Sequence, residues 1–400
     1  MARKLEDWLN SFLEFTSNTE PKKSFRLWTG ISTIAAMLQR KVSLPWGHFS
    51  IFPNLYIVLV GPSGSRKGTA MNLGYPFLRE LGIRMSAEAI TREALIKELK
   101  LSSNTQIDSQ GRPLIHCSLT VHSQELTVFL GYNNMQMMAD LCDWYDCKDR
   151  WTYRTKNQGT DELVGVWVNL EGATTPDLLR SALPADAIGG GLTARMILIF
   201  EKRKAKSVTC PFLTQDELKL RDALLSDLEQ ILMLSGEFKL SKEYLDFWNV
   251  WYPAQDAHPP FTDSRLSGYV ERRPIHALKL SIVANASRSS KMILELQDLK
   301  RGIAFMEEAE VKMPYVFSGV GKAALTDVLV RAWAFIAMNK SVRTSQLMRE
   351  FHTDADIDDL STVIRTLEAM RTIRIQYVGT DPVLDYTGTK KMEEQYGIGG

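Results

Sequence analysis

The apolar positions near the start of the chain follow a helical period. Within residues 24–42, Ile31, Ile34 and Leu38 recur at intervals of three and four, which places them on one buried face of a helix. We therefore expect residues 1–50 to form an N-terminal helical segment.

The pattern changes near residue 51, where short apolar runs begin to alternate with helical patterns. Three of these runs are rich in β-branched and aliphatic residues, as in strands buried on both faces of a parallel sheet; they lie at 54–60, 115–125 and 195–203. Two further extended runs flank a turn at Asn157–Thr160. Strands interleaved with helices predict an α/β layer fold for residues 51–210.

The remainder of the chain divides into two predicted parts. Residues 211–318 are almost wholly helical in pattern. Residues 322–390 show three short helices followed by two strands around a turn at Asp381-Pro382. Three helices and a β-hairpin in so short a segment are typical of a winged helix-turn-helix domain.

Composition narrows the class of protein without naming a function. The formal net charge is +1, which argues against a wholly basic nucleic-acid coat but not against a local basic channel. The spacings of Cys142 and Cys147 with His116 and His122 fit no standard zinc site, so reduced thiols are the favoured interpretation. Since no apolar run is long enough to span a bilayer, we expect a soluble, cytoplasmic protein.

The first candidate site is the segment GPSGSRKGTA, which directly follows the first buried strand. Its glycines allow backbone N–H groups to surround phosphate oxygens, and its lysine neutralises phosphate charge at the start of a helix. The predicted nucleotide-binding residues are Gly61, Pro62, Ser63, Gly64, Ser65, Arg66, Lys67, Gly68 and Thr69.

Two positions of this segment depart from the usual phosphate-binding loop. Arg66 stands where such loops carry glycine, and Gly68 stands where they carry the hydroxyl that binds Mg²⁺. We expect Thr69 to supply that hydroxyl and Arg66 to add a cation beside the phosphates. A simple glycine-serine turn before a helix is the alternative interpretation.

The second buried strand ends in Gln124-Glu125, where a nucleotide-hydrolysing site ordinarily has two acids. Glu125 is the candidate catalytic residue that orients the attacking water, although it is also a plausible helix-capping acid. Gln124 cannot offer a carboxylate to Mg²⁺. The two changed positions indicate either a variant metal site or a site that binds nucleotide and hydrolyses it slowly.

The loop and the order of the elements around it resemble AAA+ P-loop ATPases of the MCM-like and superfamily-three type, including phage and prophage replication helicases. The similarity runs from about residue 50 to 390, and the loop is its specific motif. It implies an ATPase core over 51–210, a helical lid over 211–318 and a winged helix over 322–390.

The resemblance also implies roles for residues outside the loop. Thr175 corresponds to the sensor 1 position, Arg195 to an arginine finger acting on the neighbouring subunit, and Arg273 to sensor 2, with Arg272 as the alternate. A hairpin before the sensor 1 strand would present Arg154 and Lys156 to DNA. An ordinary surface or structural role is the alternative interpretation for the arginines and for Lys156.

The expected function is therefore an ATP-dependent, ring-forming DNA helicase or translocase of a phage or mobile-element replication system, a hexamer that uses ATP and Mg²⁺. The alternative is a nucleotide-gated DNA-binding initiator or helicase loader with little sustained hydrolysis. Arg343, Arg349 and Arg365 of the C-terminal domain are candidate phosphate contacts in either case.

Overall fold

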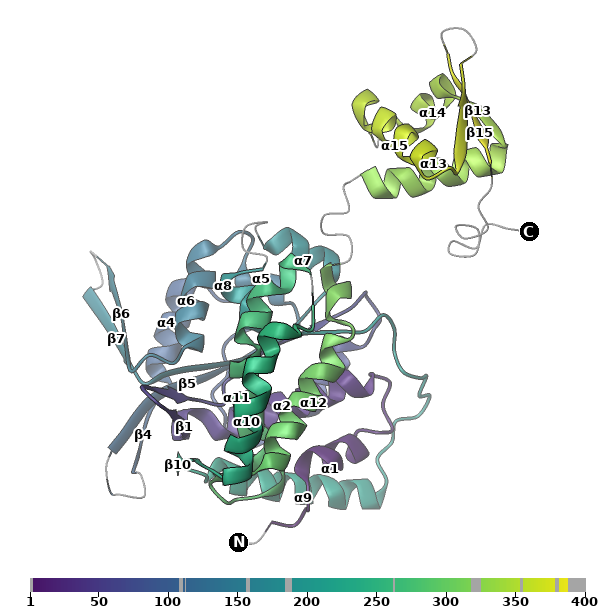
Figure 1. Cartoon of the computed structure of the whole chain (residues 1–400). Helices are drawn as coiled ribbons and strands as arrows, with labels where there is room; N and C mark the ends of the chain where they lie inside the picture. Colours follow the sequence, from purple (N-terminus) through teal and green to yellow (C-terminus); the bar gives the residue numbers. More distant parts are fainter. Residues whose placement is uncertain are drawn as a thin grey trace. The chain divides into compact units, whose positions relative to one another are not determined.

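The computed structural model describes the chain at residues 3–107, 111, 113–155, 159–183, 189–261, 263–317, 325–352, 355–377 and 381–387. The chain separates into two compact units, Met1–Phe317 and Ser318–Gly400. The first unit holds the central sheet and most of the helices (Figure 1). The α/β class predicted from the alternating pattern is confirmed.

A five-stranded sheet in the order β4-β5-β8-β3-β9 forms the centre of the first unit. Its strands are β3 (Tyr56–Val60), β4 (Ser103–Ile107), β5 (Pro113–Ser123), β8 (Val166–Thr174) and β9 (Met196–Phe200). Four of these strands are parallel, and β4 pairs antiparallel with β5 at one edge. Every residue of β3 and β9 is buried, as their continuous apolar runs predict.

The register of the sheet brings three loops together. Val60 at the end of β3 lies opposite Thr174 at the end of β8, and Ser123 at the end of β5 lies opposite Gly172. The three strands are parallel, so their carboxyl ends share one edge, the usual place for ligands in such sheets. The segment beginning at Gly61 and the pair Gln124-Glu125 both follow directly at this edge.

Helices cover both faces of the sheet. On one face, α2 (Lys23–Leu38) is joined to β8 by a hydrogen bond from Thr29 Oγ1 to Glu171 Oε1 (2.6 Å). On the other face, Tyr56 donates from its hydroxyl to the Leu141 carbonyl of α6 (2.8 Å). Tyr56 and Leu170 are register partners, so Tyr56 and Glu171 point to opposite faces.

The N-terminal helices belong to this core. All of α2 from Leu27 to Leu38 is buried, and it packs closely on α3, where a Cβ atom on Gly74 would lie only 2.6 Å from Thr33 Oγ1. Residues 1–50 therefore pack on the sheet domain within the first unit.

The sheet region has seven other helices among the described residues, of which α1 precedes the strands and the rest lie between them. They are α1 (Trp8–Phe15), α3 (Lys67–Glu80), α4 (Arg92–Leu101), α5 (Leu126–Leu130), α6 (Met135–Tyr145), α7 (Pro176–Ala182) and α8 (Gly191–Ala194). A separate antiparallel hairpin pairs β6 (Arg150–Thr155) with β7 (Gly159–Val164), as the two extended runs predicted.

Residues 211–317 are largely helical, as expected. Their helices are α9 (Gln215–Leu232), α10 (Lys242–Ala257), α11 (Ser267–Arg288) and α12 (Leu296–Glu310).

The first unit also contains short 3-10 helices and minor strands. The 3-10 helices are η1 (Gln39–Lys41), η3 (Ser264–Leu266) and η4 (Met313–Phe317). Minor strands are β1 (Val42–Trp46), β2 (Phe49–Ile51), β10 (Gly236–Glu237), β11 (Lys239–Leu240) and β12 (Ile293–Leu294).

The second unit has its own hydrophobic core, which includes Trp333, Leu347, Val363 and Leu384. Its helices are α13 (Leu325–Asn339), α14 (Thr344–Phe351) and α15 (Ile357–Ala369). Its antiparallel sheet has the order β13-β15-β14, formed by β13 (Ser341–Arg343), β14 (Ile373–Gln376) and β15 (Val383–Tyr386). The predicted three helices and two strands are present, and β13 is an addition.

None of the helices formed by the described residues combines the length and apolarity needed to cross a bilayer.

Candidate functional site

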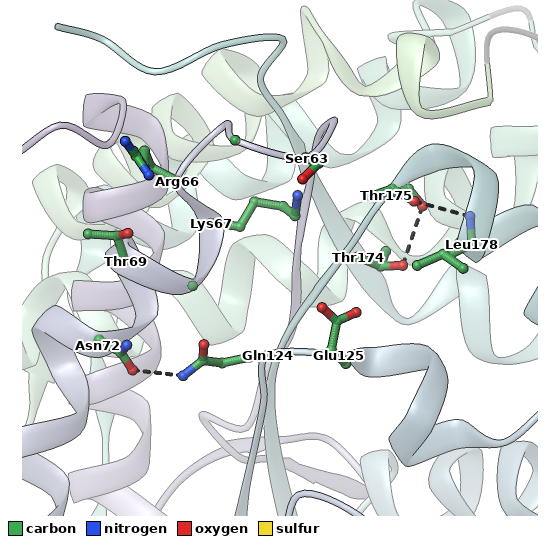
Figure 2. A pocket seen from close by; sticks show the side chains of 12 residues that line it. Ser63, Arg66, Lys67, Thr69, Asn72, Gln124, Glu125, Thr174, Thr175 and Leu178 are labelled. Atoms are coloured by element: carbon green, nitrogen blue, oxygen red, sulfur yellow. Dashed lines mark hydrogen bonds between the residues drawn. The ribbon is translucent and has the colours of Figure 1, made fainter. Parts of the chain in front are cut away.

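A pocket of about 580 Å³ opens at the carboxyl edge of the sheet (Figure 2). Three loops and the start of α3 form its wall. Its lining residues are Ser63, Gly64, Arg66, Lys67, Gly68, Thr69, Asn72, Gln124, Glu125, Thr174, Thr175 and Leu178.

The loop after β3 has the tight backbone that its glycines predict. Gly64 has a φ of 81°, a conformation that L side chains rarely adopt. At Gly61 a Cβ atom would lie 2.3 Å from the Glu201 carbonyl oxygen, so a side chain there is excluded. Ser65 is buried and donates from Oγ to the Pro62 carbonyl (2.8 Å), which closes the turn.

Helix α3 begins inside the pocket. Its first intrahelical bond runs from the Ala70 N–H to the Arg66 carbonyl (3.0 Å). The N–H groups of Lys67, Gly68 and Thr69 therefore have no intrahelical acceptor. Together with the helix dipole, these amides make the end of α3 a favourable place for an anion.

Lys67 lies over the loop rather than in open solvent. Its ammonium donates to the Gly61 carbonyl (2.7 Å) and to the Pro62 carbonyl (3.1 Å). Burial lowers the pKa of Lys67, while the negative charge of Glu125 acts in the opposite direction. A phosphate oxygen would compete for this ammonium with two neutral carbonyls, which are weaker acceptors than an anion.

The opposite wall carries Glu125 and Thr175. Glu125 precedes α5 but makes no side-chain cap, and its exposed carboxylate faces the pocket across from Lys67 (Figure 2). The hydroxyl oxygen of Thr175 accepts from the Leu178 N–H (3.2 Å) and thereby caps α7. Because that bond uses the oxygen as acceptor, the hydroxyl proton of Thr175 remains able to donate.

Gln124 crosses from β5 to the first turns of α3. Its Nε2 donates to Asn72 Oδ1 (2.9 Å), and a Cβ atom on Gly68 would lie 2.7 Å from its Oε1. The glutamine amide therefore occupies the space of a side chain at position 68. The altered position in the loop, Gly68, and the altered position after β5, Gln124, are therefore adjacent.

Arg66 has a conformation that is unusual for its residue type. It is the N-cap of α3 with a φ of 70°, and its Nε pairs with Glu20 Oε2 (2.6 Å). A hydrogen bond from Lys204, the Val208 N–H and the charge of Arg66 lower the pKa of Glu20 to about 2. The carboxylate that holds Arg66 is thus ionised throughout the physiological range.

The resemblance to AAA+ ATPases implies Mg²⁺ at this site, and the donors present can be compared with what that ion requires. Mg²⁺ is held through carboxylate or hydroxyl oxygens and phosphates. Gly68 has no donor, and Gln124 presents a neutral amide already bonded to Asn72. Thr69 lies on the side of α3 next to Arg66 (Figure 2). The residues at the two expected metal-ligand positions, 68 and 124, do not fit a Mg²⁺ bound directly by this chain.

No cluster of three or more His, Cys, Asp or Glu side chains within the described part of the chain is arranged to hold a metal ion. The cysteines Cys117, Cys142, Cys147 and Cys210 are all free.

Arg195 is distant from the pocket of its own chain. It directly precedes β9, whereas the phosphate-binding loop follows β3, and the two strands are parallel with Tyr56 opposite Met196. Five residues of strand separate the two ends by roughly 16 Å. The guanidinium is buried and pairs with Asp146 Oδ2 (2.5 Å).

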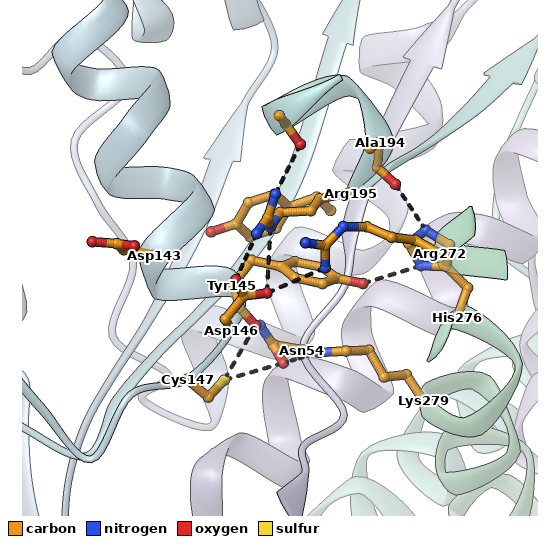
Figure 3. A network of polar contacts seen from close by, with 12 residues as sticks. Asn54, Asp143, Tyr145, Asp146, Cys147, Ala194, Arg195, Arg272, His276 and Lys279 are labelled. Carbon is orange, nitrogen blue, oxygen red and sulfur yellow. Dashed lines mark hydrogen bonds and ion pairs between the residues drawn. The ribbon is translucent and has the colours of Figure 1, made fainter. Parts of the chain in front are cut away.

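The same aspartate also binds Arg272, at 3.3 Å from Asp146 Oδ1 (Figure 3). Arg273, the residue that the resemblance matches to sensor 2, points elsewhere. Its guanidinium forms a two-bond pair with Glu310, with Nε at 2.6 Å and one terminal nitrogen at 2.9 Å. Neither arginine lines the pocket around Lys67.

The β6–β7 hairpin carries both positively and negatively charged side chains. Arg154 donates to the hydroxyl of Thr160 (2.9 Å) rather than to a carboxylate, but Arg150 pairs with Glu162 and Lys100 pairs with Asp161. Lys156, the second predicted DNA contact, lies outside the described residues. In the second unit Arg343, Arg349 and Arg365 are all exposed.

Sequence reasoning missed two residues that shape the site. Asn72 lies four positions after Gly68 and hence on the same helix face, but this spacing does not show that the face meets Gln124. Glu20 comes from the connection between α1 and α2, and no local pattern links it to Arg66.

No protein-family model matches this chain, and no curated protein matches it in sequence. The geometry and chemistry of the site are therefore what indicate a function for this chain.

Proposed function

We propose that this chain binds and hydrolyses a nucleoside triphosphate, ATP in the first instance, in the pocket at the start of α3. The observation that carries the proposal is the meeting of Lys67, Glu125 and Thr175, which come from three separate loops, beside the free amides of a helix N-terminus. A cation, a carboxylate and a hydroxyl around an anion-binding helix end suit phosphate-bond hydrolysis.

Each residue has a specific role in the proposed reaction. Lys67 exchanges its carbonyl partners for phosphate oxygens, and the first-turn amides of α3 bind the same group. Glu125 accepts a proton from the attacking water as a general base. The Thr175 hydroxyl donates to the terminal phosphate. Because Thr175 also caps α7, this bond couples the position of α7 to the presence of that phosphate.

The finer proposal is a ring-forming motor that moves DNA, as in the replication helicases that the sequence resembles. Arg195 lies at the far end of its sheet from its own pocket, so an arginine finger at this position would act on a neighbouring subunit and would first have to leave Asp146. The three helices and antiparallel sheet of the second unit suit a winged helix. Such a motor would be a homo-oligomer, proposed as a hexamer in the cytoplasm of a bacterial host.

The test compares ATP hydrolysis with and without single-stranded DNA for the natural protein, Glu125→Gln and Arg195→Ala. A motor gives turnover that DNA stimulates, and each substitution reduces that turnover by about a hundredfold or more while ATP still binds. Turnover that neither DNA nor either substitution changes would contradict the motor.

A second candidate is a nucleotide-gated assembly factor, such as an initiator or helicase loader. Two observations favour it: the amide of Gln124 in place of a carboxylate, and the burial of Arg195 against Asp146. Such a protein would bind ATP and assemble on DNA without sustained hydrolysis, which the same assay would detect as binding without turnover.

A further inference from the structure

We propose that this chain binds its nucleoside triphosphate without a protein-bound divalent ion, because Gly68 and Gln124 stand at the two metal-ligand positions and Asn72 holds the Gln124 amide. This inference rests on the nucleotide site proposed above and concerns how that site neutralises phosphate charge. It explains the changes at positions 68 and 124 as one structural unit, which we call the amide bridge: Gly68, Asn72 and Gln124.

The geometry of the amide bridge is specific. Gly68 and Asn72 lie one turn apart on α3, and the Gln124 side chain spans that turn, with its nitrogen 2.9 Å from Asn72 Oδ1. Its oxygen lies 2.7 Å from where a Cβ of residue 68 would be, well inside ordinary van der Waals contact. A serine or threonine hydroxyl at position 68 and the present Gln124 conformation therefore exclude each other.

The bridge also fixes the charge of the site. A glutamine in place of an acid removes a negative charge next to the phosphates, and Arg66 adds a positive charge to that of Lys67 on the same wall. Among the described residues that line the pocket, Glu125 is the one acid. Arg66 already has a counter-ion in Glu20, so Lys67 and the helix N-terminus supply the positive charge that faces Glu125 and favours an anion in the pocket.

The experiment measures the Kd of ATP for the full chain by calorimetry, once with excess Mg²⁺ and once with EDTA. We expect the two values to agree within about threefold, or the EDTA value to be the lower, because the free nucleotide carries more negative charge. A Kd that rises tenfold or more in EDTA would overturn the inference while leaving the nucleotide site intact. Absence of ATP binding in both buffers would overturn the nucleotide site and the inference with it.

A designed pair of variants tests the bridge itself. Gly68→Ser with Gln124→Asp restores a hydroxyl and a carboxylate, and the shorter aspartate vacates the space that serine needs. Its Kd for ATP should be at least tenfold lower with Mg²⁺ than with EDTA, since the new carboxylate repels phosphate unless a cation lies between them.

Gly68→Ala with Gln124→Asn is the matched control, because it has similar side-chain volumes and adds no new donor or charge. Its Kd values with Mg²⁺ and with EDTA should agree within threefold. Equal Mg²⁺ dependence in the two double variants would contradict the proposal.

Discussion

At the scale of single residues, Arg66 is the least expected residue of the loop after β3. A non-glycine residue at a φ of 70° carries a conformational cost on the order of 1 kcal/mol. Its side chain reaches Glu20 from the rim of the pocket. Glycine would remove the cost but also the pair with Glu20, and we propose that the guanidinium acts in addition on the anion that the pocket binds.

Substituting Arg66 with glycine separates these two effects. Arg66→Gly should leave the unfolding temperature unchanged or slightly higher, because glycine tolerates the left-handed backbone. ATP binding should weaken about tenfold or more with the loss of a charged hydrogen-bond donor. Arg66→Ala is the companion variant: it should weaken binding equally but also lower the unfolding temperature. Unchanged ATP affinity in both variants would remove Arg66 from the site.

At the scale of elements, α11 is a buried helix that nevertheless contains ionisable side chains. It is buried from Arg273 onwards with little interruption, yet it carries His276 and Lys279 inside the protein. His276 donates from Nε2 to the Ala194 carbonyl (3.3 Å), so its Nδ1 accepts from the Tyr145 hydroxyl (3.0 Å) (Figure 3). Burial lowers the pKa of His276 to about 3, consistent with a neutral ring.

Lys279 makes the stability of the first unit depend on pH. Burial lowers its pKa from 10.5 to about 8, so between these values the unfolded chain binds more protons than the folded chain. Stability therefore rises with pH across that window. From pH 7.5 to 9.5, the free energy of unfolding of the natural protein should increase by about 2 kcal/mol relative to Lys279→Met. Urea denaturation at the two pH values measures the difference.

The exposed Lys291 provides the control for that measurement, because Lys291→Met should follow the pH dependence of the natural protein. Identical pH dependence in Lys279→Met and the natural protein would show that Lys279 does not titrate in this window.

The sequence predicted the elements of the site better than their contacts. Continuous apolar runs identified β3, β5 and β9, and glycine spacing identified the loop, since both depend on local backbone and burial preferences. The contact between Gly68 and Gln124 depends on the register of β5 against α3, which no local pattern encodes. The ion pairs of Arg66 with Glu20 and of Arg273 with Glu310 likewise join residues that are far apart in the sequence.

At the scale of the whole molecule, the chain consists of two units that each bury a core of their own. Every residue that lines the proposed nucleotide pocket belongs to the first unit, Met1–Phe317. A chain that ends at Phe317 should therefore bind ATP as the full chain does. The second unit would contribute to nucleic-acid or partner contacts instead.

The most direct measurement of the central claim is the Kd of ATP for the full chain, for residues 1–317 and for Lys67→Ala, with Lys100→Ala as a control outside the pocket. We predict saturable binding of one ATP per chain, an equal Kd for residues 1–317 and the control, and a Kd at least tenfold higher for Lys67→Ala. No ATP binding, or equal binding by Lys67→Ala, would contradict the assignment of this pocket as a nucleotide site.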